Sequence, residues 1–201
     1  MNNQGMDLGF TTERIPECQH ICMIYDNEEQ RRKIVTAYLA AGIKEGNIVR
    51  YFADETSSED IHAWLVEMGI ELPQTEEDSF RIIEAEHAYC PSGRFVPQDV
   101  INNAVSRYAA ARVAGYSGSR VCGEMTWALR DIPGSERILE YEIGLNAIND
   151  TFPRVGMCQY DARRFDGAML YKVLQVHPFI IAKGQIVRNP FYITPGEANL
   201  K

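Results

Sequence analysis

The segment GEMTW, residues 123–127, places a carboxylate and an indole ring close together. A glutamate that ends a strand can polarise a water for attack on a phosphate, anchor a polar group of a ligand, or pair with an arginine. Trp127 can pack in the core or offer an aromatic face to a ligand. Catalysis by Glu124 would require a phosphate-binding loop elsewhere in the chain.

The turn where such a loop would lie is acidic instead. The predicted strand HICMIYD leads into DNEEQ, a helix that runs to Gly42, and the strand GNIVRYFA. A P-loop needs glycines, a lysine and a serine or threonine, and the glycines are missing. We expect Asp26 to cap the helix, with Glu29 completing a capping box. Glu28 and Glu29 also suit the positive end of the helix. The turn therefore indicates no phosphoryl transfer, and Glu124 is better interpreted as a structural or ligand-anchoring residue.

Cys18, His20 and Cys22 alternate, so a regular strand would direct all three to one face. Thiolate and imidazole suit zinc, but this spacing is not a standard zinc pattern and a fourth ligand is not evident. We therefore favour ordinary buried thiols and assign neither a metal nor a cofactor. Cys90, in the predicted loop HAYCPSG, is expected to be the most reactive thiol.

The chain alternates strands with amphipathic helices. This pattern predicts an α/β three-layer sandwich with about five parallel strands and a C-terminal antiparallel hairpin. Gly69 should end a helix opened by Ser57, Pro97 should begin another, and Asp166 should cap a third. The expected strands are 20–26, 46–53, 80–86, 119–127 and 155–161, with hairpin strands 179–182 and 185–188; further expected helices are 138–148 and 167–176.

Ligands of parallel sheets bind outside the carboxyl ends of the strands. The residues expected at those ends combine aromatic rings with carboxylates, which suits a small organic molecule; they are Tyr25, Asp26, Asp54, Glu55, Glu86, His87, Glu124, Thr126, Trp127, Tyr160 and Asp161. His177 is interpreted either as a turn residue bonded to a backbone carbonyl or as a pocket residue. Arg163 and Arg164 are expected to form surface ion pairs.

Composition narrows the class of protein. The 201 residues, 45% of them hydrophobic, fit one domain with a substantial core. A net charge of −8 argues against a nucleic-acid surface and an anionic membrane surface. We see no membrane span and no secretory signal, and five cysteines without a framework suit a cytoplasmic location. The expected division is an N-terminal extension 1–17, a single domain 18–195 and a tail 196–201.

Four segments in this order resemble one family: H-x4-Y at residues 20–25, GEMTW, CQYD at residues 158–161, and the stretch HP…NPFY at residues 177–192. The chain resembles the MEDS domain, a methanogen/methylotroph sensory domain typified by a dichloromethane-responsive transcriptional regulator, from about His20 to Thr194. The resemblance implies a degenerate relative of the RecA/KaiC-like ATPases that senses hydrocarbon derivatives or related small molecules. It also implies occurrence alone or fused to DNA-binding or histidine-kinase modules.

From this resemblance we expect a non-enzymatic sensory domain that takes part in transcription regulation or other signal transduction. The expected partners are a small organic ligand, a histidine kinase or transcription regulator, and a second copy in a homodimer, without direct nucleic-acid or membrane binding. The candidate ligand-binding residues are Tyr25, Glu124, Trp127, Tyr160, His20 and His177. Two alternatives stay open: a KaiC-like nucleotide-binding protein with an altered loop, and a protein-binding signalling module without a small ligand.

Overall fold

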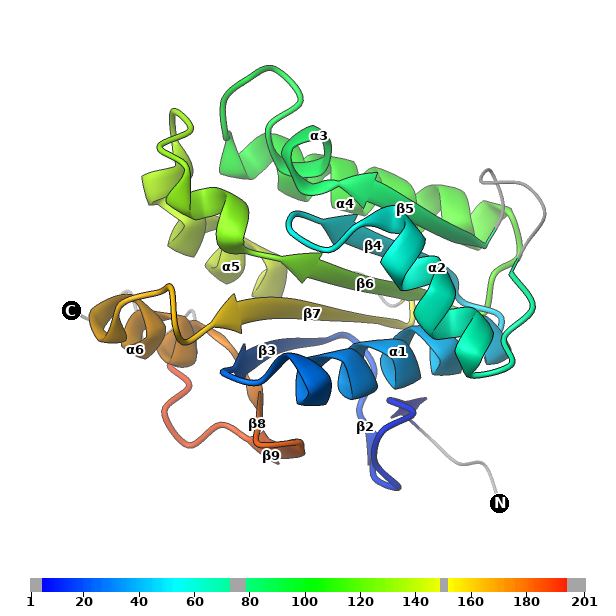
Figure 1. The fold of residues 1–201 in the computed structure, drawn as a ribbon. Coiled ribbons are helices and arrows are strands. Elements are labelled where there is room, and N and C mark those ends of the chain that lie inside the picture. Colours follow the sequence, from blue (N-terminus) through cyan, green and yellow to red (C-terminus); the bar gives the residue numbers. More distant parts are fainter. Residues whose placement is uncertain (1–4, 73–78, 149–151, 195–201) are drawn as a thin grey trace.

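A seven-stranded sheet forms the centre of the molecule in the computed structural model, which describes residues 5–72, 79–148 and 152–194 (Figure 1). Its strand order is β5 (Phe80–Glu84), β4 (Ile48–Ala53), β6 (Ser119–Glu124), β7 (Arg154–Asp161), β3 (Gln19–Tyr25), β8 (Phe179–Ala182) and β9 (Gln185–Arg188). Neighbouring strands are parallel except β8 and β9, which form the expected antiparallel hairpin. Because β8 itself pairs parallel to β3, the sheet has one more parallel strand than the sequence predicted.

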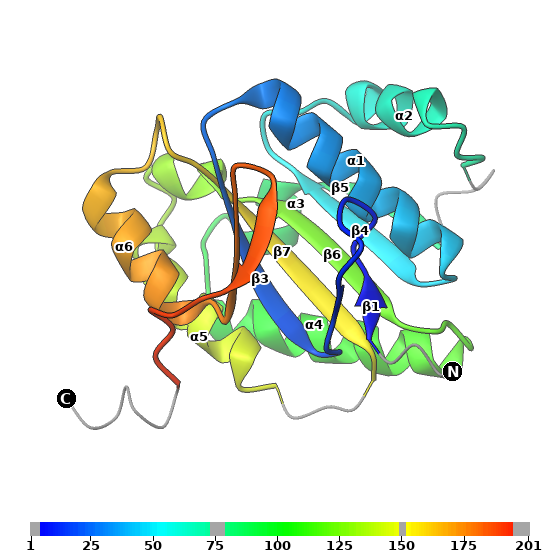
Figure 2. The same cartoon turned by 90° about the horizontal axis from the view of Figure 1, so that it is seen from below.

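Helices cover both faces of this sheet, which confirms the predicted three-layer α/β fold (Figure 2). One face carries α1 (Glu28–Lys44) and α2 (Ser58–Glu67). The opposite face carries α3 (Ala85–Tyr89), α4 (Pro97–Val113), α5 (Ile138–Asn146) and α6 (Gly167–Val176), with the short 3-10 helices η1 (Thr126–Leu129) and η2 (Ser135–Arg137). Each face has its own apolar core, because alternate residues of every buried strand point to opposite sides.

The ends of α1 differ from the predicted ones. Asn27, not Asp26, caps the helix, and its side chain accepts a hydrogen bond from the backbone N–H of Gln30 at 2.8 Å. Glu29 pairs with Lys33 one turn later instead of closing a capping box. The helix also continues past Gly42 to Lys44. A Cβ at Gly42 would lie 2.6 Å from Cδ of buried Arg120, so this glycine permits close packing and does not end the helix.

Two predicted strands end earlier than expected. β5 ends at Glu84, and Glu86 and His87 belong to α3. β6 ends at Glu124, and Trp127 lies in η1. β5 ends level with its neighbour β4, at the pair of Glu84 with Ala53. β6 leaves the sheet after the pair of Glu124 with Gln159, where Met125 leads into the turn of η1. By contrast, Ser57 and Asp166 cap α2 and α6 as predicted.

Residues before the predicted domain boundary also pack onto the fold. β1 (Met6–Asp7) and β2 (Arg14–Ile15) form a small antiparallel pair, and Leu8 is fully buried. Arg120 donates a hydrogen bond to the Asp7 carbonyl at 2.7 Å. The predicted tail, 196–201, lies outside the described residues. Within the described part of the chain, no helix has the length and apolar character needed to cross a membrane.

Candidate functional site

The carboxylate of Glu124 is buried at the carboxyl end of β6 and is saturated with hydrogen bonds. Its Oε2 accepts from the backbone N–H groups of Asp54, Glu55 and Thr56 at 3.0, 2.6 and 3.2 Å. Its Oε1 accepts from the Tyr51 hydroxyl at 2.5 Å and from Arg31 at 3.4 Å. A carboxylate offers about four acceptor positions, so none is left to take a proton from a water molecule. Glu124 therefore holds the loop that follows β4.

Arg31 lies in the first turns of α1, beside the turn where a P-loop would place phosphate. Its buried guanidinium donates to Thr56 Oγ1 at 2.7 Å, Gln159 Oε1 at 3.1 Å and Glu28 at 2.8 Å, besides Glu124. It also lies 5.2 Å from the centroid of the Tyr25 ring. Burial alone would lower the pKa of Arg31, but the surrounding Tyr51 and Glu124 raise it above its ordinary value. Arg31 is therefore a permanently charged side chain that lies beside the acidic turn.

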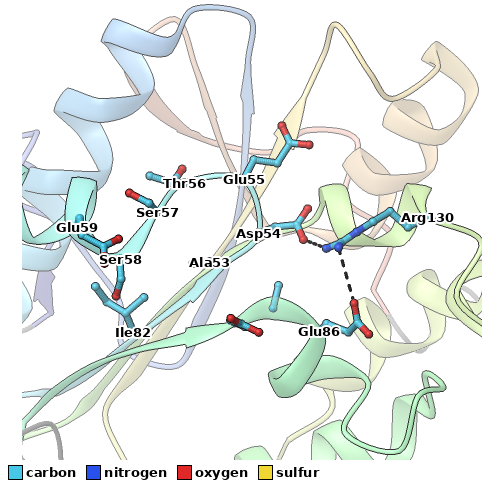
Figure 3. A pocket seen from close by; sticks show the side chains of 12 residues that line it. Ala53, Asp54, Glu55, Thr56, Ser57, Ser58, Glu59, Ile82, Glu86 and Arg130 are labelled. Carbon is cyan, nitrogen blue, oxygen red and sulfur yellow. Dashed lines mark ion pairs between the residues drawn. The ribbon is translucent and has the colours of Figure 1, made fainter.

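A cavity of about 540 Å³ opens beside this network at the carboxyl ends of β4 and β5 (Figure 3). Its polar lining carries five carboxylates, from Asp54, Glu55, Glu59, Glu84 and Glu86, and the guanidinium of Arg130. Arg130 forms ion pairs with Asp54 and, at 3.7 Å, with Glu86 (Figure 3). Thr126 donates to the second oxygen of Asp54 at 2.6 Å. We call this cavity the carboxyl-edge pocket; its lining favours a cation or a donor of hydrogen bonds.

The structure separates the six predicted ligand residues into three groups. Tyr25 and Glu124 lie near Arg31 on the face covered by α1. Tyr160, His20 and His177 gather on the opposite face, beside α5. Trp127 is fully buried in an aromatic cluster, stacked on Tyr89 at 4.9 Å between ring centroids. Ligand binding by these six residues stays a prediction, and the structure does not place them in one pocket.

Three residues that carry these networks were missed by the sequence analysis: Arg31, Glu142 and Arg130. A signal for two of them was present. Arg31 continues the apolar stripe of α1 by one turn, because Ile34 and Val35 follow at three and four positions. Glu142 likewise falls within the stripe of α5, four positions after Ile138, and is fully buried. A charged residue inside an apolar stripe predicts a buried polar partner.

The thiols are distributed differently from the predicted Cys-His-Cys face. Cys18 lies before β3 with φ of 61°, outside the regular strand that holds His20, and it donates to the Phe152 carbonyl at 3.5 Å. Cys22 is buried on the same face as His20. It is not one of the residues whose ligand atoms cluster with His20, which are Glu142, Cys158 and His177. Cys90 is buried too, and burial raises the pKa of its thiol to about 11. The prediction of a reactive Cys90 is wrong, because the turn after α3 packs into the core.

A family model, described as the methanogen/methylotroph, DcmR sensory domain and abbreviated MEDS, matches residues 19–178. The chain belongs to the MEDS family. The resemblance found from the four segments is therefore confirmed. MEDS is described as a sensory domain, so the chain has a sensory or regulatory role.

The MEDS chain is also similar to the transcriptional repressor DcmR of Methylorubrum extorquens. The two are 26% identical over 174 residues, which is 86% of this chain and 60% of the repressor. The chain thus spans about three fifths of the length of this relative. The similarity agrees with the regulatory role of the family.

Several solved structures share the fold of this MEDS chain at low sequence identity. A KaiC-like protein of Pyrococcus horikoshii has a TM-score of 0.57 and 13% identity, with 83% of this chain and 71% of that chain covered. The flagellar accessory protein FlaH of Methanocaldococcus jannaschii has a TM-score of 0.61 and 9% identity, with 87% and 77% covered. An uncharacterized Pyrococcus horikoshii protein in complex with an unknown peptide also has a TM-score of 0.61, at 14% identity, with 86% and 82% covered. These likenesses confirm the predicted KaiC-like fold.

Proposed function

We propose that this MEDS chain is a non-enzymatic sensory domain that binds a small organic molecule and passes the bound state to a partner. The observation that carries the proposal is the saturated carboxylate of Glu124. A glutamate that accepts three backbone N–H groups and a tyrosine hydroxyl cannot act as a general base without breaking its own loop. In this proposal Glu124 has a structural role: it holds the loop that forms one wall of the carboxyl-edge pocket.

The ligand we propose is a small organic molecule with a cationic or hydrogen-bond-donating group, bound in the carboxyl-edge pocket. The lining has five carboxylates and the guanidinium of Arg130, and Arg164 pairs with Glu55 from outside it, so carboxylates still outnumber guanidinium groups at this pocket. A cation would compete with Arg130 for Asp54 and Glu86. Arg130 follows η1 and Glu86 lies in α3, so their ion pair connects these two elements. A ligand that breaks the pair would remove this connection and let η1 and α3 shift relative to each other. That change is a route from ligand to output.

Calorimetry and thermal unfolding with three one-carbon probes test the pocket: methylammonium, methanol and dichloromethane. We expect methylammonium to stabilise the protein most, and a concentration one hundred times the Kd to add about 2.7 kcal/mol to the free energy of unfolding. Glu86→Gln should weaken this response, because it removes one carboxylate of the lining. Glu140→Gln is the matched control, since Glu140 of α5 is similarly exposed but pairs with Arg137 of η2. If methylammonium stabilises both variants equally, or if no probe binds the wild type, the proposed ligand site is wrong.

A nucleotide-binding role is the first alternative, and the KaiC-like fold is the observation that favours it. A triphosphate at the β3–α1 turn would meet Glu28, whose carboxylate is paired with Arg31 and Arg163. We expect calorimetry with ATP and Mg²⁺ to show no binding in the micromolar range and no turnover. Micromolar affinity would replace the sensory proposal by the nucleotide-binding one.

A protein-binding module without a small ligand is the second alternative. It shares with our proposal an output through another chain, either a histidine kinase, a transcription regulator or a second copy. A homodimer is the commonest assembly of soluble proteins, so we expect one here. Light scattering across a concentration series measures it; a monomer at every concentration would remove the homodimer from the proposal.

A further inference from the structure

Four ligand-type side chains from four different elements meet on the face of the sheet opposite Arg31. They are His20 of β3, Glu142 of α5, Cys158 of β7 and His177 after α6, and all four are buried. One donor atom of each lies within 4.8 Å of the corresponding atoms of the others. We call these residues the buried quartet. They are not among the residues that line the carboxyl-edge pocket.

The strand register explains why two members of the quartet face each other. His20 is paired with Gly156 in the parallel ladder of β3 and β7, two positions before Cys158. Both side chains point to the face that carries α5, because residues two apart on a strand share a face. Gly156 has no side chain between them. Glu142 then reaches the sheet from the apolar stripe of α5, and the turn after α6 brings His177 against His20 with ring centroids 4.1 Å apart.

Four contacts between donor atoms of the quartet are 3.0–3.5 Å long, close to the spacing of ligands around one metal ion. Glu142 Oε2 lies 3.0 Å from His20 Nε2, 3.4 Å from His177 Nε2 and 3.5 Å from Cys158 Sγ. His20 Nε2 lies 3.3 Å from Cys158 Sγ. In a tetrahedral zinc site with Zn–N of about 2.0–2.1 Å and Zn–S of about 2.3 Å, neighbouring ligand atoms are about 3.3–3.8 Å apart. The donor atoms are thus close enough to ligate one ion, since all of them lie within 4.8 Å of one another.

The hydrogen-bond pattern of His177 is an independent observation that points to a cation. Its Nδ1 lies 2.8 Å from the Val173 carbonyl oxygen, which can only accept, so Nδ1 carries the proton. In the neutral ring Nε2 is then a bare lone pair. This fully buried atom has no hydrogen-bond partner in the described structure, although it faces the Glu142 carboxylate. A lone pair that faces a carboxylate is unfavourable, and either a proton on Nε2 or a metal ion between the two groups relieves it.

We propose that His20, Glu142, Cys158 and His177 bind a transition-metal dication, with Zn²⁺ as the best fit. Two imidazole nitrogens, a thiolate and a carboxylate oxygen are all zinc ligands. The charges also balance, since one thiolate and one carboxylate neutralise a dication in a site that water does not reach. On binding, the metal–sulfur bond forms as the Cys158 S–H bond breaks, and the proton leaves to solvent.

The surroundings of the quartet fit this role. The Val173 carbonyl fixes the ring orientation of His177, and the Tyr160 hydroxyl donates to the other oxygen of Glu142. Such outer contacts orient metal ligands and set their basicity. A small cavity of about 30 Å³, lined by residues that include His20, Asn146 and Gly156, lies beside the quartet.

Metal analysis of the purified chain tests the site. After exposure to a chelator and reconstitution with Zn²⁺, the wild type should retain about one equivalent, because the quartet offers one set of four ligands. Reconstitution with Co²⁺ should give the intense visible bands of a tetrahedral ion and a thiolate charge-transfer band. Cys158→Ser should abolish the charge-transfer band, and Glu142→Gln should lower zinc affinity by at least about tenfold.

Two further variants complete the test: a control outside the site and a variant of an outer contact. Cys122→Ser removes an equally buried thiol that contacts Gln159 on the α1 face, and it should leave the cobalt spectrum unchanged. Tyr160→Phe keeps all four ligands but loses an outer hydrogen bond, so zinc should bind with about tenfold to hundredfold lower affinity. A folded wild type that retains no dication, or a cobalt complex without the thiolate band, would overturn the proposal. Neither result depends on the variants folding, and neither bears on the carboxyl-edge pocket.

Discussion

Arg31 and Glu124, which are 93 residues apart in the chain, form a buried ion pair with Nη1 3.4 Å from Oε1. The pair joins the first turns of α1 to the carboxyl end of β6. Through Glu124 it also holds the three backbone N–H groups of the loop after β4. One interaction therefore lies beside the turn where a P-loop would place phosphate, and it fixes a wall of the carboxyl-edge pocket.

Arg31→Met should destabilise the protein by about 3–5 kcal/mol, because it leaves the Glu124 carboxylate buried without its guanidinium. Arg32→Met is the control, since Arg32 is the next residue but pairs with Glu67 at the surface. Its loss should cost at most about 1 kcal/mol. Urea unfolding measures both variants. Equal losses would mean that the buried network is not a major contribution to stability.

Gly123→Ala should destabilise the protein by about 1–3 kcal/mol, since a Cβ there would lie 2.2 Å from the Tyr89 hydroxyl oxygen. The next atom of that ring would be 3.4 Å away, an ordinary contact. Tyr89→Phe should therefore relieve most of the clash, so that the double variant is more stable than the sum of the single losses by about 1 kcal/mol. Strictly additive losses in chemical unfolding would show that the backbone, not the hydroxyl, resists the methyl group.

Trp127→Ala should cost about 3–5 kcal/mol, because the indole is fully buried against Tyr89 and Phe95. Trp127→Phe should cost about 1–2 kcal/mol and keep the response to methylammonium, since Trp127 does not line the carboxyl-edge pocket. Thermal unfolding with and without the probe measures both effects. Loss of the response in a well-folded Trp127→Phe protein would support the pocket predicted from the sequence instead.

Thiol labelling at pH 8 should modify Cys18 first, because it is the one partly exposed cysteine of the five. Burial raises the pKa of Cys22, Cys90 and Cys122, to about 11 for Cys90, so these thiols stay protonated and inaccessible. A thiol with a raised pKa gains reactivity only as pH approaches that value. Cys18→Ser should remove the fast phase seen with a disulfide reagent. A fast phase that persists in Cys18→Ser and disappears in Cys90→Ser would contradict the burial of Cys90.

The sequence determined the parts of this protein that depend on local pattern. The alternation of apolar strands with amphipathic helices predicted the three-layer fold, and the side chains at Ser57 and Asp166 predicted the caps of α2 and α6. The absence of glycines in DNEEQ predicts that this turn does not form a P-loop, which stays a prediction. Four short segments identified the family, because their order and spacing are themselves features of the linear chain.

Only the tertiary structure decided which side chains meet. Glu124 and Tyr160 both lie near the carboxyl edge, yet they point to opposite faces, because residue positions on neighbouring strands alternate between two sides of the sheet. Arg31 reached Glu124, and Glu142 reached His20 and His177, across long stretches of sequence. A buried charge is stable only beside its partner, and chain periodicity fixes the direction of a side chain without fixing the element that will stand opposite it.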